Sequence, residues 1–444
     1  MNYLIKNATV VNENEIDVYD VLIESGLIHK IERNISNPKN YTEIDATGLC
    51  LLPGAIDDQV HFREPGLTHK GEIYTEAKAA VAGGITSFME MPNTNPQSVS
   101  ILELEKKYSR AAECSLANYS FFMGGTNTNI EETLKVDYKK VCGLKLFMGS
   151  STGDMLVDNE KTIDEFFSKL NCLIATHCEY DPLVKEIQTR IIAEYGQDLP
   201  AYFHPIIRNE EACFKSSSFA VELAKKHNTR LHILHISTAK ELSLFTNKIP
   251  LKQKRITAEA CIHHLWFSDD DYKTKGNFIK WNPSIKTQYD RDKIFEAVLN
   301  DTIDVIATDH APHTLEEKMQ PYLQAPSGGP LVQHSILAML DFYHNKKISL
   351  EKIVEKMSHN VADLFRIEKR GYIKEGYFAD LVLVNLNKPQ TVSKQNLLYK
   401  CGWSPFEGHT FKSTIEKTFV NGHLVYDNGT FNEVQKGKRL LFNI

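Results

Sequence analysis

Polar side chains with the chemistry of metal ligands stand inside or at the ends of apolar stretches that are spread along this sequence. Histidine nitrogens and carboxylate oxygens are the usual protein ligands of zinc and similar divalent ions. A single histidine at the end of a strand is more often a hydrogen-bonded core residue, but three of them with an aspartate, each on a separate stretch, predict a metal site. The residues concerned are His61, Lys145, His177, His235 and Asp309.

The first of these stretches also carries an arginine. Residues 57–66 read Asp-Asp-Gln-Val-His-Phe-Arg-Glu-Pro-Gly and follow the apolar residues 51–56. Side chains two positions apart in a strand point to the same side, so Gln59, His61 and Arg63 would share one face. The pattern predicts a metal ligand beside a side chain that binds a carboxylate. The alternative is a charged loop that follows a strand.

Lys145 lies in the middle of the strand pattern 143–148, on the face opposite Leu144 and Leu146. A free ammonium inside a barrel is costly to bury and would repel a cation. A carbamate formed with carbon dioxide would instead turn this amine into a carboxylate that two divalent ions can share. The alternative is a lysine whose ammonium reaches past the rim of the site.

Asp309 belongs to the segment Ala-Thr-Asp-His-Ala-Pro-His at residues 307–313. A carboxylate beside both a metal and a water can accept the water's proton and return it to a leaving nitrogen. A metal lowers the pKa of such a water to about 7. His313 lies just beyond on a loop, where it can contact a substrate, whereas His310 is expected to pack behind the site.

Strand patterns alternate with helix patterns between residues 54 and 370, which predicts a parallel α/β fold. We expect its closed form, a (β/α)8 barrel of the TIM type, because the carboxyl ends of barrel strands meet at one mouth and would bring the polar residues together. Strands are predicted at 55–61, 85–91, 118–123, 141–148, 173–177, 230–235, 255–261 and 303–308. Helices are predicted at 72–82, 101–114, 163–170 and 209–227, and after Ser237 or Thr238.

The two ends of the chain read as short strands, including a pattern at residues 371–373. We expect residues 1–53 and 371–444 to form one composite β-sandwich, and residues 54–370 to form the catalytic barrel. The proline- and glycine-rich segment 311–330 is predicted to be a long functional loop, such as a lid over the site.

Composition narrows the class of protein. The 444 residues are 42% hydrophobic and 24% charged, with a net charge of -6 and no basic run, which argues against a nucleic-acid partner. No apolar run reaches the ~18 residues that a membrane helix needs. Eight cysteines without a Cys-x-x-Cys pair predict reduced thiols and a cytoplasmic location.

Taken together, the motifs resemble those of the amidohydrolase superfamily and, within it, the dihydroorotases. The resemblance covers nearly the whole chain. It rests on residues 57–66, Met-Pro-Asn-Thr at 91–94, Thr-His-Cys-Glu at 176–179, 232–237, 308–313 and 371–384.

The resemblance implies a metal-dependent cyclic amide hydrolase that reversibly cyclises N-carbamoyl-L-aspartate to L-dihydroorotate in pyrimidine synthesis. It implies one or two zinc ions held by the five residues named first, with Lys145 N6-carboxylated and Asp309 as the catalytic residue. For the substrate it implies contacts from Arg63, Asn93, Asn282 and His313. It leaves open a homodimer and an association with an aspartate transcarbamoylase.

This chain departs from the family pattern at one ligand. The family has His-x-His on its first strand, whereas here the segment is Gln59-Val60-His61. A glutamine offers only a weak neutral oxygen, so the ion that position 59 would bind is expected to be weakly held, different or absent. Some members of the group use an aspartate in place of Lys145, which leaves the bridging ligand open as well.

Two functions other than dihydroorotase are compatible with parts of the sequence. Allantoinases and dihydropyrimidinases share the fold and metal chemistry, but their neutral cyclic substrates need no arginine at the place of Arg63. A non-catalytic dihydroorotase-like scaffold is favoured by Gln59 alone, while His61, His177, His235 and Asp309 are all kept.

Overall fold

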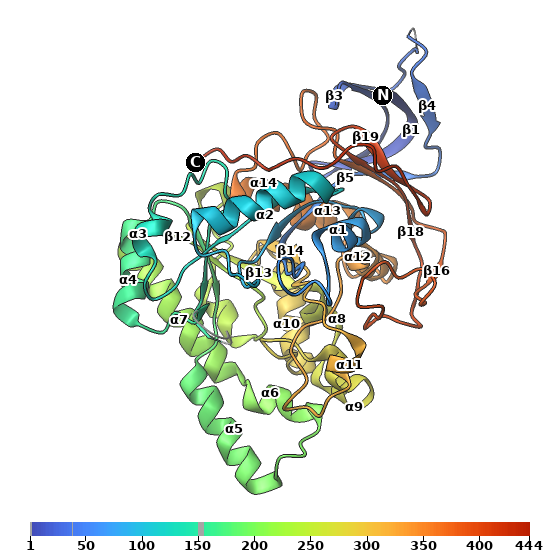
Figure 1. The fold of residues 1–444 in the computed structure, drawn as a ribbon. Helices are drawn as coiled ribbons and strands as arrows, with labels where there is room; N and C mark the ends of the chain where they lie inside the picture. The colour runs from blue at the N-terminus through green and yellow to red at the C-terminus, as the bar shows by residue number, and fades with distance from the viewer. Residues whose placement is uncertain (1, 38, 150–154) are drawn as a thin grey trace.

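The computed structural model describes residues 2–37, 39–149 and 155–444. Its central element is a ring of parallel strands with the helices around it (Figure 1). One parallel sheet holds β6 (Ala55–Val60), β7 (Ile85–Glu90) and β8 (Asn118–Phe121). The other parallel sheet holds β9 (Met123–Gly124), β10 (Leu144–Phe147), β11 (Leu173–His177), β12 (Arg230–Ile233), β13 (Ile256–Cys261) and β14 (Val305–Ala307).

Two junctions join these sheets into a closed barrel. On one side, β8 continues into β9 with only Phe122 between them. On the other side, Val60 pairs in parallel with His310, and the backbone N–H of His61 donates to the carbonyl of His310 at 2.7 Å. The predicted (β/α)8 barrel is therefore confirmed.

Helices cover the outside of the barrel. They include α1 (Ile73–Ala82), α2 (Ile101–Cys114), α4 (Glu160–Lys169), α5 (Asp181–Tyr195), α7 (Glu210–His227), α8 (Ile262–Trp266), α10 (Gln288–Leu299), α12 (Ser335–His344) and α14 (Asn360–Phe365). Local signals set their ends: the Ser100 hydroxyl accepts the N–H of Glu103 at the start of α2, and α7 stops at Asn228 in a left-handed conformation. Helix α5 was not predicted, and the helix expected after Ser237 is a 3-10 turn at Lys240–Leu244.

Both ends of the chain build one composite β unit, which was predicted as a β-sandwich and is connected here as one nine-stranded sheet; Figure 1 shows the blue and red strands side by side above the barrel. The strand order is β20 (Thr430–Phe431), β19 (His423–Asp427), β18 (Thr414–Val420), β15 (Leu381–Asn385), β5 (Cys50–Pro53), β1 (Tyr3–Asn12), β2 (Glu15–Glu24) and β3 (Leu27–Glu32), with β4 (Thr42–Asp45) on β1. Strand β5 pairs with β1 in parallel and with β15 antiparallel, so it joins the two ends. Residues 371–373 form no strand, which corrects that prediction: the Ile373 N–H donates to the side chain of Asn12 instead of entering a ladder.

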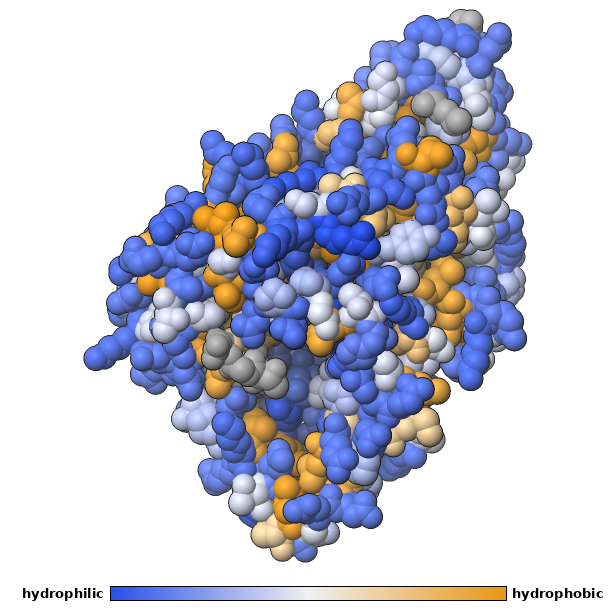
Figure 2. All heavy atoms as spheres, in the orientation of Figure 1, coloured by the Kyte–Doolittle hydropathy of each residue, from blue (hydrophilic) through white to orange (hydrophobic). Residues whose placement is uncertain are grey.

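The surface in this view is mostly hydrophilic, with hydrophobic residues gathered over α5 and the neighbouring α6 (His204–Ile207) (Figure 2). Tyr195, Tyr202 and Ile206 are among the exposed large hydrophobic residues of this region. Within the described part of the chain, no helix combines the length and the apolar character needed to span a bilayer.

Candidate active site

Every site residue predicted from the sequence lines one pocket of ≈ 310 Å³ at the mouth of the barrel. The lining residues are Gln59, His61, Arg63, Asn93, Lys145, Phe147, His177, His235, Trp281, Asn282, Asp309, Ala311, His313, Pro326, Ser327 and Gly328. Gln59, His61 and Arg63 all face the pocket and are buried, although β6 ends at Val60, so the predicted strand alternation does not extend to His61 and Arg63. Residues 61–66 do form a loop after β6, as the alternative interpretation held, but His61 and Arg63 are buried in it and line the pocket.

The first pair of potential ligands is His61 and Asp309. Nε2 of His61 lies 3.2 Å from Oδ1 of Asp309, while Nδ1 of His61 lies 2.8 Å from Oδ1 of Asn93. Because an amide oxygen can only accept, His61 carries its proton on Nδ1 and turns the lone pair of Nε2 towards Asp309. Burial lowers the pKa of His61, which keeps this ring neutral.

The second pair is His177 and His235, whose Nδ1 and Nε2 atoms lie 2.9 Å apart. Nε2 of His177 donates to Oε2 of Glu179 at 2.9 Å, which leaves its Nδ1 free of a proton and directed at His235. Glu179 also accepts a hydrogen bond from Nη1 of Arg208 at 2.7 Å. Burial, with His177 and Lys145 nearby, lowers the pKa of His235 well below its usual value.

Lys145 lies fully inside the barrel and is 1% exposed, so the reading of a lysine that reaches past the rim is wrong. Its Nζ has no hydrogen-bond partner among the described residues and lies 4.5 Å from the centre of the Phe147 ring. Burial lowers the pKa of Lys145 to about 7, so a large share of this amine is neutral at physiological pH. A neutral amine is the form that reacts with carbon dioxide.

Three site residues adopt backbone conformations that side chains other than glycine rarely take. The φ angles are 71° for Arg63, 39° for His235 and 47° for Asp309. Such conformations are costly, and they persist where the surrounding structure holds them for function. Each of the three stands where a strand passes into a loop, and the turn aims its side chain into the pocket.

A positively charged wall lies next to the potential metal ligands. The Nε of Arg63 donates to the carbonyl of Pro312 at 3.0 Å, and its Nη2 lies 3.0 Å from Nε2 of His313. Nζ of Lys70 lies 3.1 Å from Nδ1 of the same ring. A neutral imidazole can accept only one of these two donors, so one cation keeps an N–H for a ligand. Burial lowers the pKa of Arg63 to about 10, and Arg63 therefore stays cationic at neutral pH.

The remaining wall comes from two loops. Oδ1 of Asn282 has no hydrogen-bond partner in the described part of the chain, which makes it a free acceptor beside the pocket. Nζ of Lys280 donates to the carbonyl of Tyr322 at 2.7 Å, and Nζ of Lys318 donates to that of Gly328 at 2.7 Å. Lys280 thus ties the predicted lid segment 311–330 to the loop before Trp281, and Lys318 ties that segment to itself.

These residues fit a bound divalent ion. Two pairs of ligand atoms at 3.2 Å and 2.9 Å face the pocket, with the unpartnered nitrogen of Lys145 in the same site. A carboxylated Lys145 would supply a second anionic ligand besides Asp309, next to His177 and His235, which are neutral ligands. The side-chain NH₂ of Gln59 donates a hydrogen bond to Asp309 at 3.2 Å, and Gln59 contributes no strong metal ligand.

A family model described as "Amidohydrolase family" matches residues 50–425, which is most of the chain. The chain belongs to the amidohydrolase family. Among curated relatives of this amidohydrolase, a dihydroorotase from Methanosarcina acetivorans is 31% identical over 91% of the chain and 88% of its own length. An allantoinase from Salmonella paratyphi B is 30% identical over 96% of the chain and 95% of its own length.

Solved structures support the same fold for this amidohydrolase. The L-hydantoinase (dihydropyrimidinase) from Arthrobacter aurescens superposes with a TM-score of 0.93, covers 99% of both chains and is 24% identical. The dihydropyrimidinase from Brevibacillus agri superposes with a TM-score of 0.90 over both full chains at 24% identity. This likeness shows the barrel with its added sheet, and it leaves the substrate open.

Sequence reasoning missed several residues of this amidohydrolase site. Glu179 stands in the motif at 176–179, and a carboxylate two positions after a candidate histidine ligand was a signal that could have placed it. Arg208, Lys70 and Lys318 lie on helices and loops far from the strand ends, and no spacing rule connects them to the site. Phe147 and Trp281, which are next to the motifs of Lys145 and Asn282, were not predicted to line the pocket, although both do.

Proposed function

We propose that this amidohydrolase is a dihydroorotase, which interconverts L-dihydroorotate and N-carbamoyl-L-aspartate. The supporting observation is the buried cation Arg63 in the same pocket as His61 and Asp309. Both partners in this reaction carry a carboxylate, and a guanidinium binds a carboxylate with two parallel hydrogen bonds. Allantoin and dihydrouracil are neutral rings and offer no group to neutralise such a cation.

Substrate recognition is proposed to use both walls of the pocket. Arg63 binds the carboxylate, with His313 beside it as a neutral donor or acceptor; burial and Arg63 lower the pKa of His313 well below its usual value. The Oδ1 of Asn93 is engaged by His61, so Asn93 offers its NH₂ group. Oδ1 of Asn282 is free to accept an N–H of the ring.

In the hydrolytic direction, water adds to the ring amide carbonyl, the bond from this carbon to the ring nitrogen breaks, and a new carboxylate forms. A zinc ion, or two, held by His61, Lys145, His177, His235 and Asp309 would lower the pKa of water and polarise the carbonyl. Asp309 accepts the proton of the attacking water and returns it to the leaving nitrogen. Glu179 holds the ring of His177 in place, and Asn93 does the same for His61.

Allantoinase is the second candidate, because the Salmonella allantoinase resembles the chain as closely as the dihydroorotases do. A non-catalytic scaffold is the third, and Gln59 is the feature that favours it. A scaffold has no need for the strained conformations of His235 and Asp309, which argues for catalysis. Homodimerisation and association with an aspartate transcarbamoylase stay predictions.

The deciding experiment measures metal content and the hydrolysis of L-dihydroorotate, allantoin and dihydrouracil, before and after chelation. We expect turnover of L-dihydroorotate that depends on metal and disappears in Asp309→Ala. Turnover of allantoin or dihydrouracil without that of dihydroorotate would assign the chain to a neighbouring activity. A folded protein that binds no metal and turns over none of the three substrates would favour the non-catalytic scaffold.

A further inference from the structure

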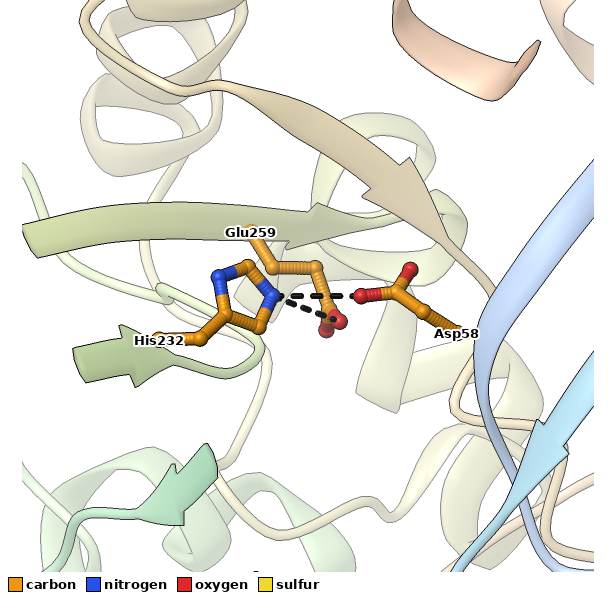
Figure 3. A group of neighbouring side chains, drawn as sticks. All are labelled: Asp58, His232 and Glu259. Atoms are coloured by element: carbon orange, nitrogen blue, oxygen red, sulfur yellow. Dashed lines mark hydrogen bonds and ion pairs between the residues drawn. The ribbon is translucent and has the colours of Figure 1, made fainter. Parts of the chain in front are cut away.

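A second cluster of metal-binding side chains lies in the interior of the barrel. Asp58 on β6, His232 on β12 and Glu259 on β13 point towards one another (Figure 3). All three side chains are fully buried, and none of them lines the pocket. Their ligand atoms all lie within 4.8 Å of one another, and no other group of three or more His, Cys, Asp and Glu residues in the described ranges is as compact.

The hydrogen bonds around His232 determine where its proton lies. The hydroxyl of Thr257 donates its only hydrogen to the carbonyl of Leu231 at 3.1 Å. The Thr257 oxygen therefore accepts the Nδ1–H of His232, at 2.9 Å. A neutral ring then turns the lone pair of Nε2 towards the two carboxylates. In metal sites, a histidine usually donates the N–H of its other ring nitrogen to a hydrogen-bond acceptor, which fixes the orientation and tautomer of the ring.

Nε2 of His232 lies 3.1 Å from Oδ2 of Asp58 and 3.6 Å from Oε2 of Glu259. A lone pair facing two anionic oxygens is repulsive, so positive charge must lie between them. That charge is either a proton, held by Nε2 or by one of the carboxyl groups, or a metal cation. Ligands of a tetrahedral zinc ion at about 2.0–2.1 Å lie roughly 3.3 Å apart, and the two observed distances bracket that separation.

Charge balance favours the cation. A proton on His232 neutralises one of the two buried carboxylates, whereas a divalent ion neutralises both. Oδ1 of Asp58 and Oε2 of Glu259 have no hydrogen-bond donor among the described residues. Buried anionic oxygens without donors are costly, and coordination to an ion removes that cost.

We propose that Asp58, His232 and Glu259 form a binding site for a divalent transition-metal ion such as zinc, separate from the pocket and beneath it. Two carboxylates and one imidazole are a donor set for such an ion. Glu259 also accepts the backbone N–H of His235 at 2.9 Å through Oε1, and Asp58 immediately precedes Gln59. An ion here would therefore tie together three strands whose ends carry the pocket. The proposal does not rest on the substrate of the pocket.

The test counts zinc in protein whose pocket has been disabled. The double variant His61→Asn/His177→Asn, made with zinc present and dialysed, is expected to keep about one zinc per chain. Adding Asp58→Asn, which changes charge but not shape, should remove that zinc. Glu76→Gln is the matched control, because Glu76 and His310 form another fully buried carboxylate–histidine pair, at 2.9 Å, and its loss should leave the zinc in place.

A folded double variant without zinc would overturn the proposal, as would a zinc count that Asp58→Asn does not change. Anomalous diffraction at the zinc edge on crystals of the unsubstituted protein covers the case in which a variant does not fold. We expect a peak within bonding distance of the three side chains. Density maps that show the three residues without such a peak would mean that a proton holds this cluster together.

Discussion

The side-chain amide of Gln59 donates a hydrogen bond to Oδ1 of Asp309 at 3.2 Å. The same oxygen lies 3.2 Å from Nε2 of His61. Among the described residues, the one donor to Oε1 of Gln59 is Sγ of Cys261, in a weak hydrogen bond at 3.7 Å. Gln59 therefore positions the carboxylate of Asp309, in a place where a histidine would bind an ion.

Gln59→His is expected to raise the zinc content of the protein by about one ion per chain. An imidazole is a far better ligand than a neutral amide oxygen, and it would complete a set with His61 and Asp309. Elemental analysis after dialysis measures the change. Gln59→Asn, which also cannot ligate strongly, serves as the control, and an unchanged count in Gln59→His would show that the pocket holds no room for a second ion.

Arg63→Gln is expected to lower kcat/KM for L-dihydroorotate by roughly 10- to 150-fold. Hydrogen bonds to charged groups contribute about 1.5–3 kcal/mol, and the substrate carboxylate would lose its cation. Steady-state kinetics measures the loss. Arg110→Gln is the control, because Arg110 pairs with Glu64 at the surface. A similar loss in both variants would mean that Arg63 acts through stability.

Asp309→Asn is expected to reduce kcat by roughly 10²- to 10⁴-fold, the usual contribution of general acid–base catalysis. An amide of the same shape keeps the contact with Gln59 but cannot take up a proton. Single-turnover kinetics, with dihydroorotate binding measured separately, resolves the two effects. A normal kcat would remove Asp309 from the proton-transfer role.

Lys145 should form a carbamate that depends on pH. Because burial lowers its pKa to about 7, the neutral amine prevails above pH 7 and the ammonium prevails below it. Protein equilibrated with ¹³C-bicarbonate at pH 8 should show a carbamate signal by NMR that weakens towards pH 6. Lys145→Met is the control. A signal that persists in this variant would come from another amine.

Metal-free protein should lose stability as the pH rises above neutral. Burial disfavours the charged form of His232, but Asp58 and Glu259 outweigh this and raise its pKa to about 9. The stabilisation of about 3 kcal/mol is complete below pH ~6.5 and is lost as the pH passes through 9. Thermal unfolding after chelation, from pH 6 to 10, measures it. Asp58→Asn should flatten the profile, and equal slopes in both proteins would contradict the charge assignment.

The barrel and the pocket could be predicted because their signals are local. Alternation of strands and helices predicts the barrel, and polar residues at the ends of several strands point to the mouth, as His177 and Asp309 illustrate. Arg208 could not be predicted, because its contact with Glu179 depends on how α6 packs over the barrel.

The cluster beneath the pocket was also missed, for a physical reason. Asp58 and His232 sit on different strands, and a register of parallel strands cannot be read from one sequence. The nearby residues Gln59 and His235 belong to the pocket motifs that the sequence makes visible. The bulge between Asp57 and Val60 allows the successive side chains Asp58 and Gln59 of β6 to face two different clusters.

Strand β5 has a consequence for synthesis on the ribosome. Its partner β1 precedes it in the chain, but β15, which covers its other side, is translated only after every strand of the barrel. Until then the apolar edge formed by Leu51 and Leu52 is open, and open edges of this kind pair with strands of other chains. The nascent protein therefore exposes an aggregation-prone strand edge during most of its translation. Pairing with β15, one of its last segments, covers that edge.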